Sequence, residues 1–314
     1  MPVGCSAQQG ESGMGFLLRC ATANGVSLHG LRDLCGISSV RTIWSSDAAS
    51  LAGVLAIPAH ELQDILVDKR KHMDALAYRV GGQIILRTEL LRLSKPQVCV
   101  ACVHRDGYCK ALWDSRLYTV CHIHRTPMVE QCKVCGSPLR WHRPAVDVCQ
   151  CGAYLQSDHD QVMHPDASEV WVAGRIANYF ASGCRFEGMS GALPTWMVEL
   201  SLDGFLALIQ AFGVQLQPHQ KVVNASVAKM PVEFWRGVCC RAVQRLSDYT
   251  VSKDTKQLSP WIWEGGLESL ALSFVRHADQ QVAIKLLRDV FGIEVLARFG
   301  SQRTVLCQMP LFED

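Results

Sequence analysis

The sequence has no long apolar run that is free of charge, although 49% of its 314 residues are hydrophobic. A membrane-spanning helix needs about 18 or more such residues in succession, so none is expected. The opening segment, MPVGCSAQQGESGMG, also lacks the charged and then apolar layout of a secretory signal peptide. We therefore expect a soluble protein of the bacterial cytoplasm, with no membrane partner.

An excess of charge of one sign is also missing. The 31 Lys and Arg residues nearly balance the 29 Asp and Glu residues, which leaves a net charge of +2. This balance excludes a strong overall field that would draw the protein to nucleic acid or to a membrane. Any nucleic-acid contact has to come from a local basic patch.

Common catalytic motifs are absent as well. The sequence contains no P-loop, no GxGxxG after a strand, no HExxH and no GxSxG. The acidic residues are scattered through helical patterns, whereas strand-transfer chemistry needs carboxylates that converge on two magnesium ions. Cys109 and His104 form a conceivable nucleophile and base, but nothing in the sequence orients them. The sequence therefore predicts a protein that is not an enzyme.

What the sequence does have is a concentration of cysteine. More than half of its fifteen cysteines lie between residues 99 and 152. In a reducing compartment, closely spaced cysteines are more often metal ligands than disulfide partners. This segment also has few long apolar runs, so we expect metal ions rather than a large hydrophobic core to hold it together.

The spacing of these residues predicts two structural zinc sites. A structural zinc ion takes four thiolate or imidazole ligands, which come as two close pairs on tight turns. The first predicted site consists of Cys99, Cys102, Cys121 and His124. The second predicted site consists of Cys132, Cys135, Cys149 and Cys151. Four protein ligands leave no open position on either ion, so both are expected to be structural. An interleaved arrangement, in which the first and third pairs share one ion, is the alternative.

Helical periodicity dominates the rest of the chain, so the predicted fold class is mainly α with a small zinc-ribbon or zinc-finger module. We expect an N-terminal helical region over residues 1–94, a double zinc module over 95–158 and a C-terminal helical domain over 159–314. Residues 47–76 have the pattern of a helix-turn-helix, in which Pro58 opens the second helix. This helix pair is expected to serve protein docking or dimerisation.

A few residues outside the zinc sites are candidates for contact with nucleic acid or a protein partner. The basic residues of the 47–76 segment are placed at the end of its second helix, where they match the helix dipole. Contact with nucleic acid or an acidic partner is their alternative role. Tryptophans in a loop-like stretch are candidate partner anchors. The candidate contact residues are Lys69, Arg70, Lys71, Arg105, His142, Arg143, Trp261 and Trp263.

Two stretches of the chain resemble the TniQ family. ESGMGFLLRCATANGVSLHGL, from Glu11 to Leu31, is similar to the family's opening, with its Glu-Ser, bulky helix, Ala-Asn-Gly and Ser. The segment 99–136 follows the family's order of Cys-x-x-Cys, Gly-Tyr, Trp, Cys-x-x-His and Cys-x-x-Cys-Gly, and CQCGAYL fits a closing Cys-x-Cys-Gly. At Val100, His122 and Arg125 the chain departs from the family's usual Pro and Gly, but none of these is a predicted ligand.

This resemblance, over about residues 11–155, implies recruitment rather than catalysis. TniQ-like proteins are target-selection adaptors of transposons that use an AAA+ ATPase regulator of the TnsC type. One branch binds an RNA-guided Cascade complex, often as a homodimer, and would contact nucleic acid mostly through that complex. A TnsD-like branch reads an attachment site in DNA directly, with a longer C-terminal extension. The short C-terminal part favours the first branch. A third hypothesis is a zinc-stabilised interaction scaffold that is unrelated to transposition.

Overall fold

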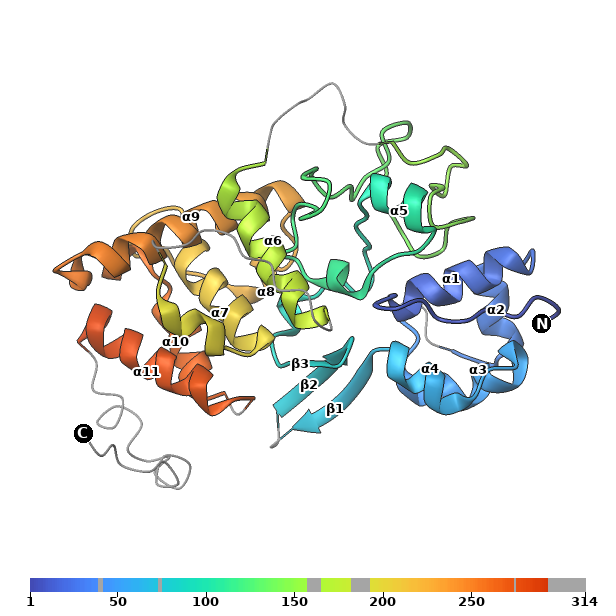
Figure 1. Ribbon diagram of the computed structural model, residues 1–314, viewed down its shortest axis with the longest axis horizontal. Coiled ribbons are helices and arrows are strands. Elements are labelled where there is room, and N and C mark those ends of the chain that lie inside the picture. The colour runs from blue at the N-terminus through green and yellow to red at the C-terminus, as the bar shows by residue number, and fades with distance from the viewer. Residues whose placement is uncertain (39–41, 73–74, 157–164, 182–192, 274, 293–314) are drawn as a thin grey trace. The chain divides into compact units, whose positions relative to one another are not determined.

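The computed structural model describes residues 1–38, 42–72, 75–156, 165–181, 193–273 and 275–292 (Figure 1). Within them the chain is mainly helical with one small sheet, so the predicted fold class is confirmed. The chain forms two compact units, residues 1–191 with 223–240 and residues 192–222 with 241–314. The boundaries expected near residues 94 and 158 both fall within the first unit and stay predictions. No helix of the described residues is long and apolar enough to cross a membrane.

The first unit begins with two pairs of short helices. They are α1 (Gly13–Ala23), α2 (Leu28–Leu34), α3 (Ala48–Leu55) and α4 (Ala59–Ile65), with a 3-10 turn at Ser45–Asp47 before α3. The hydroxyls of Ser12 and Ser27 accept hydrogen bonds from the backbone N–H groups of Gly15 and Gly30, at 3.1 and 3.0 Å. Each serine thereby satisfies one of the orphan donors at the start of α1 or α2. Each helix buries apolar side chains completely, namely Leu17, Leu31, Leu51 and Leu62.

The helix-turn-helix predicted over residues 47–76 is correct for its two helices, but its second helix ends earlier than predicted. The helix α4 stops at Ile65, and a three-stranded antiparallel sheet follows in the order β1 (Asp68–His72), β2 (Ala75–Val80) and β3 (Gln83–Ile85). Gly81 and Gly82 have φ values of 53° and 82° in the turn between β2 and β3, a conformation that glycine adopts without strain. Lys69, Arg70 and Lys71 therefore lie on a strand, and their interpretation as helix-terminal charges is wrong.

The segment that carries the cysteine pairs is built from turns and isolated bridges. Its helices are short: the 3-10 turn Thr88–Leu90, α5 (Val100–Asp106) and the 3-10 turn Ala111–Asp114. Single β-bridges join Val98 to Val129, Val120 to Pro127 and Gln131 to Pro138. The first unit also includes α6 (Ala167–Phe180), α8 (Asn224–Val227) and the beginning of α9 (Val232–Val251). A buried ion pair joins α6 to α9, with Arg236 Nε 2.7 Å from Glu169 Oε1.

The second unit is helical throughout its described residues. It comprises the 3-10 turn Thr195–Glu199, α7 (Leu202–Gly213), the remainder of α9, the 3-10 turn Thr255–Trp261, α10 (Glu264–Ala271) and α11 (His277–Phe291). The helix α7 is buried along its whole length. A Cβ atom at Gly204 would lie 2.3 Å from Asp279 Oδ1, so a larger residue at this position of α7 would displace the Asp279 carboxylate of α11. The Asp279 carboxylate in turn accepts the backbone N–H of Ser201, at 2.8 Å.

Candidate metal centre

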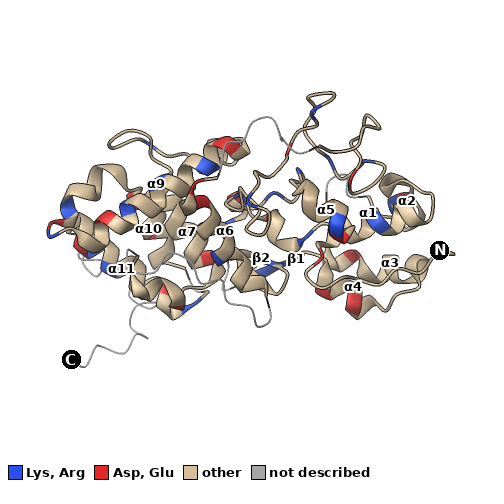
Figure 2. Cartoon of the chain, turned by 45° about the horizontal axis from the view of Figure 1, so that its top comes forward, with Lys and Arg blue, Asp and Glu red and all other residues tan. Residues whose placement is uncertain are grey.

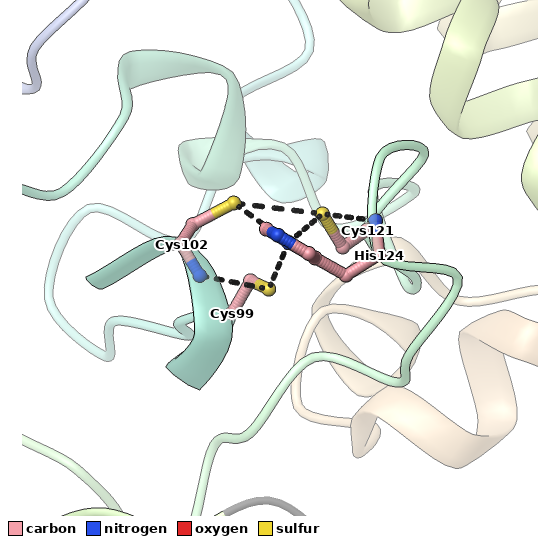
Figure 3. Close-up of side chains that lie close together, drawn as sticks. All are labelled: Cys99, Cys102, Cys121 and His124. Carbon is pink, nitrogen blue, oxygen red and sulfur yellow. Dashed lines mark hydrogen bonds between the residues drawn. The ribbon is translucent and has the colours of Figure 1, made fainter. Parts of the chain in front are cut away.

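Four side chains from two short turns meet in the first cluster (Figure 3). Cys99 caps the N-terminus of α5, and Cys102 follows in the first turn of that helix. Cys121 and His124 lie on the turn that the bridge between Val120 and Pro127 closes. Backbone hydrogen bonds shape this turn, with the Cys121 N–H donating to Thr126 O and the Arg125 N–H donating to Cys121 O, both at 2.8 Å.

The spacing of the donor atoms fits a tetrahedral metal ion. His124 Nδ1 lies 3.4, 3.2 and 3.5 Å from the sulfurs of Cys99, Cys102 and Cys121, and the sulfurs of Cys102 and Cys121 are 3.7 Å apart. A tetrahedral zinc ion with Zn–S bonds of about 2.3 Å separates its sulfurs by about 3.8 Å, and sulfur from nitrogen by about 3.5 Å. The residues present therefore fit the predicted group, with Nδ1 as the histidine ligand.

The second cluster brings together the other four predicted ligands, Cys132, Cys135, Cys149 and Cys151. Two pairs of sulfurs, Cys132 with Cys151 and Cys135 with Cys149, are each 3.8 Å apart. Gly136 and Gly152 follow the second cysteine of each pair with φ values of 67° and 87°, which lets the backbone turn beneath the sulfurs. These distances again fit a tetrahedral set of four sulfurs around one ion.

The grouping is the sequential one, because all donor atoms within each cluster lie within 4.8 Å of one another. The interleaved alternative is not what the structure has.

The cysteines of both clusters are free thiols rather than disulfide partners. Cys109 belongs to neither cluster: it is 1% exposed, and burial raises the pKa of its thiol to about 11. His122 is likewise a member of neither cluster. Its Nδ1 lies 2.8 Å from the Tyr118 hydroxyl.

The protonation of the thiols shows why a cation suits these clusters. Hydrogen bonds from Cys102 and Cys99 lower the pKa of the Cys121 thiol, while donation to Cys121 and Cys99 raises the pKa of Cys102. In the second cluster, backbone hydrogen bonding at Ser137 lowers the pKa of Cys135 to about 6, whereas burial raises the pKa of Cys149 to about 12. Neighbouring sulfurs thus cannot all ionise without a positive charge between them, which a divalent metal ion supplies.

An ion held by all four side chains of either cluster would have no open position for a substrate or an activated water. Such an ion would hold the loops of its cluster in place.

The remaining candidate residues differ in their placement. Lys69, Arg70 and Lys71 are exposed on β1. Arg105 forms a bidentate ion pair with its neighbour Asp106, at 2.6 and 2.9 Å, and its Nη1 lies 3.5 Å from His124 Nε2. The predicted contact residue His142 is exposed on its loop.

Arg143 does not lie at the surface as expected, because it is 4% exposed. Its guanidinium donates to the carbonyl oxygens of Arg140, Ala145 and Val146, at 2.8, 3.1 and 3.2 Å. This side chain therefore orders the loop that leads to Cys149, and a role in contacting a partner does not fit its burial.

The two candidate tryptophans lie in the second unit. Trp261 is 36% exposed beneath the Arg245 guanidinium, which lies 5.4 Å from the ring centroid. It lines an open groove of about 520 Å³ with residues of α9 and the 255–261 turn. Trp263 is half-buried, and its ring is so close to Gly266 that a Cβ there would lie 2.6 Å from it. Trp261 is therefore the more exposed of the two.

Sequence reasoning missed Gln97, a buried side chain whose hydrogen bonds hold the segment between α5 and Cys121 in place. The buried Nε2 of Gln97 donates to the carbonyl oxygens of Trp113, Ser115 and Tyr118, at 3.1, 3.0 and 2.8 Å. These bonds fix the chain between α5 and Cys121. No pattern in the sequence marks this residue, because its role depends on carbonyl groups that are distant from it along the chain.

Replacing Gln97 with leucine is expected to destabilise the first unit by about 2 kcal/mol or more, because buried carbonyl oxygens lose their donor. Urea denaturation monitored by tryptophan fluorescence measures the loss. The matched control is Gln257→Leu, at an exposed glutamine, which is expected to change stability by less than about 0.5 kcal/mol. Equal effects of the two substitutions would show that the three hydrogen bonds of Gln97 contribute nothing.

A protein-family model described as TniQ matches residues 2–128. The matched part includes α1 to α5, the small sheet and the whole first cluster, and it ends before the second cluster. The structure by itself defines a mainly helical protein with two closed cysteine-rich clusters. The match then identifies residues 2–128 as a TniQ domain, which associates the chain with transposition. No curated protein matches the chain.

Proposed function

We propose that this protein is a non-enzymatic adaptor of transposition, which links a target-recognition complex to an AAA+ regulator of the TnsC type. The observation that carries the proposal is the TniQ domain over residues 2–128. The recognition complex is an RNA-guided Cascade, and the adaptor acts as a homodimer. The closed four-ligand clusters are consistent with this role, because they would stabilise a recruiting surface without offering a catalytic metal.

Both clusters are proposed to hold zinc in the cell. The residues that would hold the first ion are Cys99, Cys102, Cys121 and His124, and those for the second are Cys132, Cys135, Cys149 and Cys151. When bound, zinc supplies a fixed tetrahedral crosslink between two turns of the chain. Four bonds of this kind constrain a segment made of turns and single bridges more tightly than its backbone hydrogen bonds do alone.

Co-expression tests the adaptor role. The tagged full-length protein is co-expressed with an AAA+ ATPase of the TnsC type and the subunits of a Cascade complex, and is then purified. The adaptor role predicts that the ATPase and Cascade both co-purify with it. If neither does so while the protein itself is folded and monodisperse, the proposal is wrong.

The alternative is a TnsD-like protein that reads an attachment site in duplex DNA by itself. The basic residues of the small sheet, next to a helix pair, are the observation that favours it. Filter binding of duplex DNA over a range of salt concentrations separates the two functions. Direct reading predicts a steep salt dependence and a preferred sequence, whereas the adaptor predicts weak duplex binding without sequence preference.

A further inference from the structure

The small sheet presents a basic edge. Strand β1 lies at the edge of the three-stranded sheet, and its consecutive residues Lys69, Arg70 and Lys71 are all exposed. Figure 2 colours the Lys and Arg residues of the chain blue and its Asp and Glu residues red. Successive side chains of a strand point to opposite faces. Lys69 and Lys71 therefore share one face of the sheet, and Arg70 lies on the other face with Asp68.

The cations on the Arg70 face are already neutralised. Arg70 pairs with Asp68, whose pKa is lowered by the hydrogen bonds from Ser45 and Arg70 against the opposing effect of burial. Arg79, the partner of Asp68 across the ladder, lies 4.0 Å from the same carboxylate and 3.9 Å from Asp64. This face is balanced in charge and has little left to attract an anion.

The opposite face combines free cations with aromatic rings. Across the ladder, Lys69 is opposite Tyr78 and Lys71 is opposite Leu76, which is 43% exposed. The chain at Trp44 bridges to Val67, and the indole ring lies 5.6 Å from the Tyr78 ring. We name Trp44, Lys69, Lys71, Leu76 and Tyr78 the lysine–aromatic face. Among the described residues, neither lysine is in an ion pair. The carboxylate of Asp47 accepts the backbone N–H of Trp44, at 2.8 Å.

We propose that the lysine–aromatic face binds single-stranded nucleic acid, without regard to its sequence. Lysines at alternate positions of a strand attract successive phosphates, and the half-buried rings of Trp44 and Tyr78 offer surfaces on which unpaired bases stack. A duplex hides the faces of its bases, so it would use the lysines alone. An acidic peptide would likewise leave the rings without a partner. The proposal goes beyond the adaptor role, because it assigns nucleic-acid binding to this chain itself.

Fluorescence anisotropy of the purified full-length protein tests this inference without any partner present. The probes are fluorescein-labelled oligo(dT) and oligo(U) of about twenty nucleotides, and a mixed-sequence duplex of equal length. The single strands are expected to bind at least fivefold more tightly than the duplex. Comparison of the two single strands shows whether the deoxyribose or the ribose form is preferred, and either preference supports the proposal.

Two sets of variants locate the binding site. In Lys69→Gln/Lys71→Gln, the slope of log K against log salt is expected to fall in magnitude by about 1.4, or about 0.7 for each lost phosphate contact. Lys253→Gln/Lys256→Gln, at exposed lysines of the second unit, makes the same change in net charge and should leave the slope unaltered. Tyr78→Leu is expected to weaken binding about fivefold or more through lost stacking, whereas Tyr78→Phe should preserve it.

Three results would overturn the inference. One is an equal salt slope for the two double lysine variants, and another is duplex binding as tight as single-strand binding. The third is displacement of the oligonucleotide by poly-L-glutamate at equal charge concentration, which would make an acidic protein segment the ligand instead. Circular dichroism of each variant confirms that the fold is retained. None of these measurements depends on the ATPase, so the adaptor role stands or falls separately.

Discussion

Replacing Cys102 with alanine is expected to lower the zinc content from two ions to one and to unfold the segment around the first cluster. Cys102 is one of the four side chains of that cluster, and its sulfur lies 3.2 Å from His124 Nδ1 and 3.7 Å from the Cys121 sulfur. Structural zinc in finger peptides contributes about 10–16 kcal/mol of apparent binding free energy at neutral pH. The net stability of a typical domain is only about 5–15 kcal/mol, so loss of one ion is decisive.

Cys109→Ala provides the matched control. Both cysteines are 1% exposed and lie close together in the sequence, but Cys109 is outside the cluster, with the Arg143 Nη2 at 3.7 Å from its sulfur. This substitution is expected to keep both ions and to cost about 1 kcal/mol through lost packing. Differential scanning calorimetry together with metal analysis compares the two variants. Retention of two ions and an unchanged melting temperature in Cys102→Ala would contradict the first site.

The stability of the protein is expected to fall with rising pH because of one buried carboxyl group. Asp114 is 7% exposed, and burial raises the pKa of its carboxyl to about 8. In the unfolded chain an aspartate ionises near pH 3.9, so between about pH 4 and about pH 8 the folded state holds a proton that the unfolded state has lost. The free energy of unfolding therefore decreases by up to about 1.4 kcal/mol for each pH unit in this window. Above it both states are ionised, and the contribution stays constant.

Asp114→Asn removes this titration while keeping a polar side chain of the same size. Urea denaturation of both proteins at about pH 5.5 and about pH 7.5 should show that the variant gains about 3 kcal/mol on the wild type across that interval. Zinc ligands also bind protons at the lower pH, but the difference between the two proteins cancels this shared effect. Parallel stability profiles for the two proteins would show that Asp114 is ionised in the folded state.

The sequence was sufficient to predict which cysteine and histidine side chains gather in the two clusters, because the determinants of each ligand pair are local. Each pair of ligands lies on one tight turn, so the spacing from Cys99 to Cys102 or from Cys121 to His124 already specifies which side chains face one ion. The order of the pairs did not decide between the sequential and the interleaved grouping, which needed the distances between the donor atoms in the structure. The TniQ resemblance was likewise visible in short motifs, including Ser12 and Ser27, which the structure shows to be helix caps.

The small sheet could not be predicted from the residues of β1. Asp-Lys-Arg-Lys-His has no β-branched or apolar residue, so neither propensity nor alternation identifies it as a strand. Pairing with β2 decides its conformation. The overlooked signal was Gly81-Gly82 between two apolar segments, which is typical of a hairpin. This turn would have ended the predicted helix earlier and moved Lys69 and Lys71 onto a strand.

The interior of the cysteine-rich segment was also underestimated. We expected the metal ions to replace a hydrophobic core there, yet Trp113, Tyr118, Leu139 and Trp141 are all at most 3% exposed. These apolar residues do not recur with a helical or strand period, because the backbone between them turns irregularly. Their burial depends on contacts between distant loops, which a period-based reading does not detect. The metal ions and this core are therefore expected to stabilise the segment together.

The most direct test of the account is the metal content of the freshly purified full-length protein. Native mass spectrometry, with elemental analysis of the same sample, gives the identity of the metal and the number of ions per chain. We predict two zinc ions, one for each cluster, and their stepwise loss with unfolding as a chelator is added. A folded protein that contains no transition metal would contradict the central claim that two tetrahedral sites hold the TniQ domain and its following loops in place.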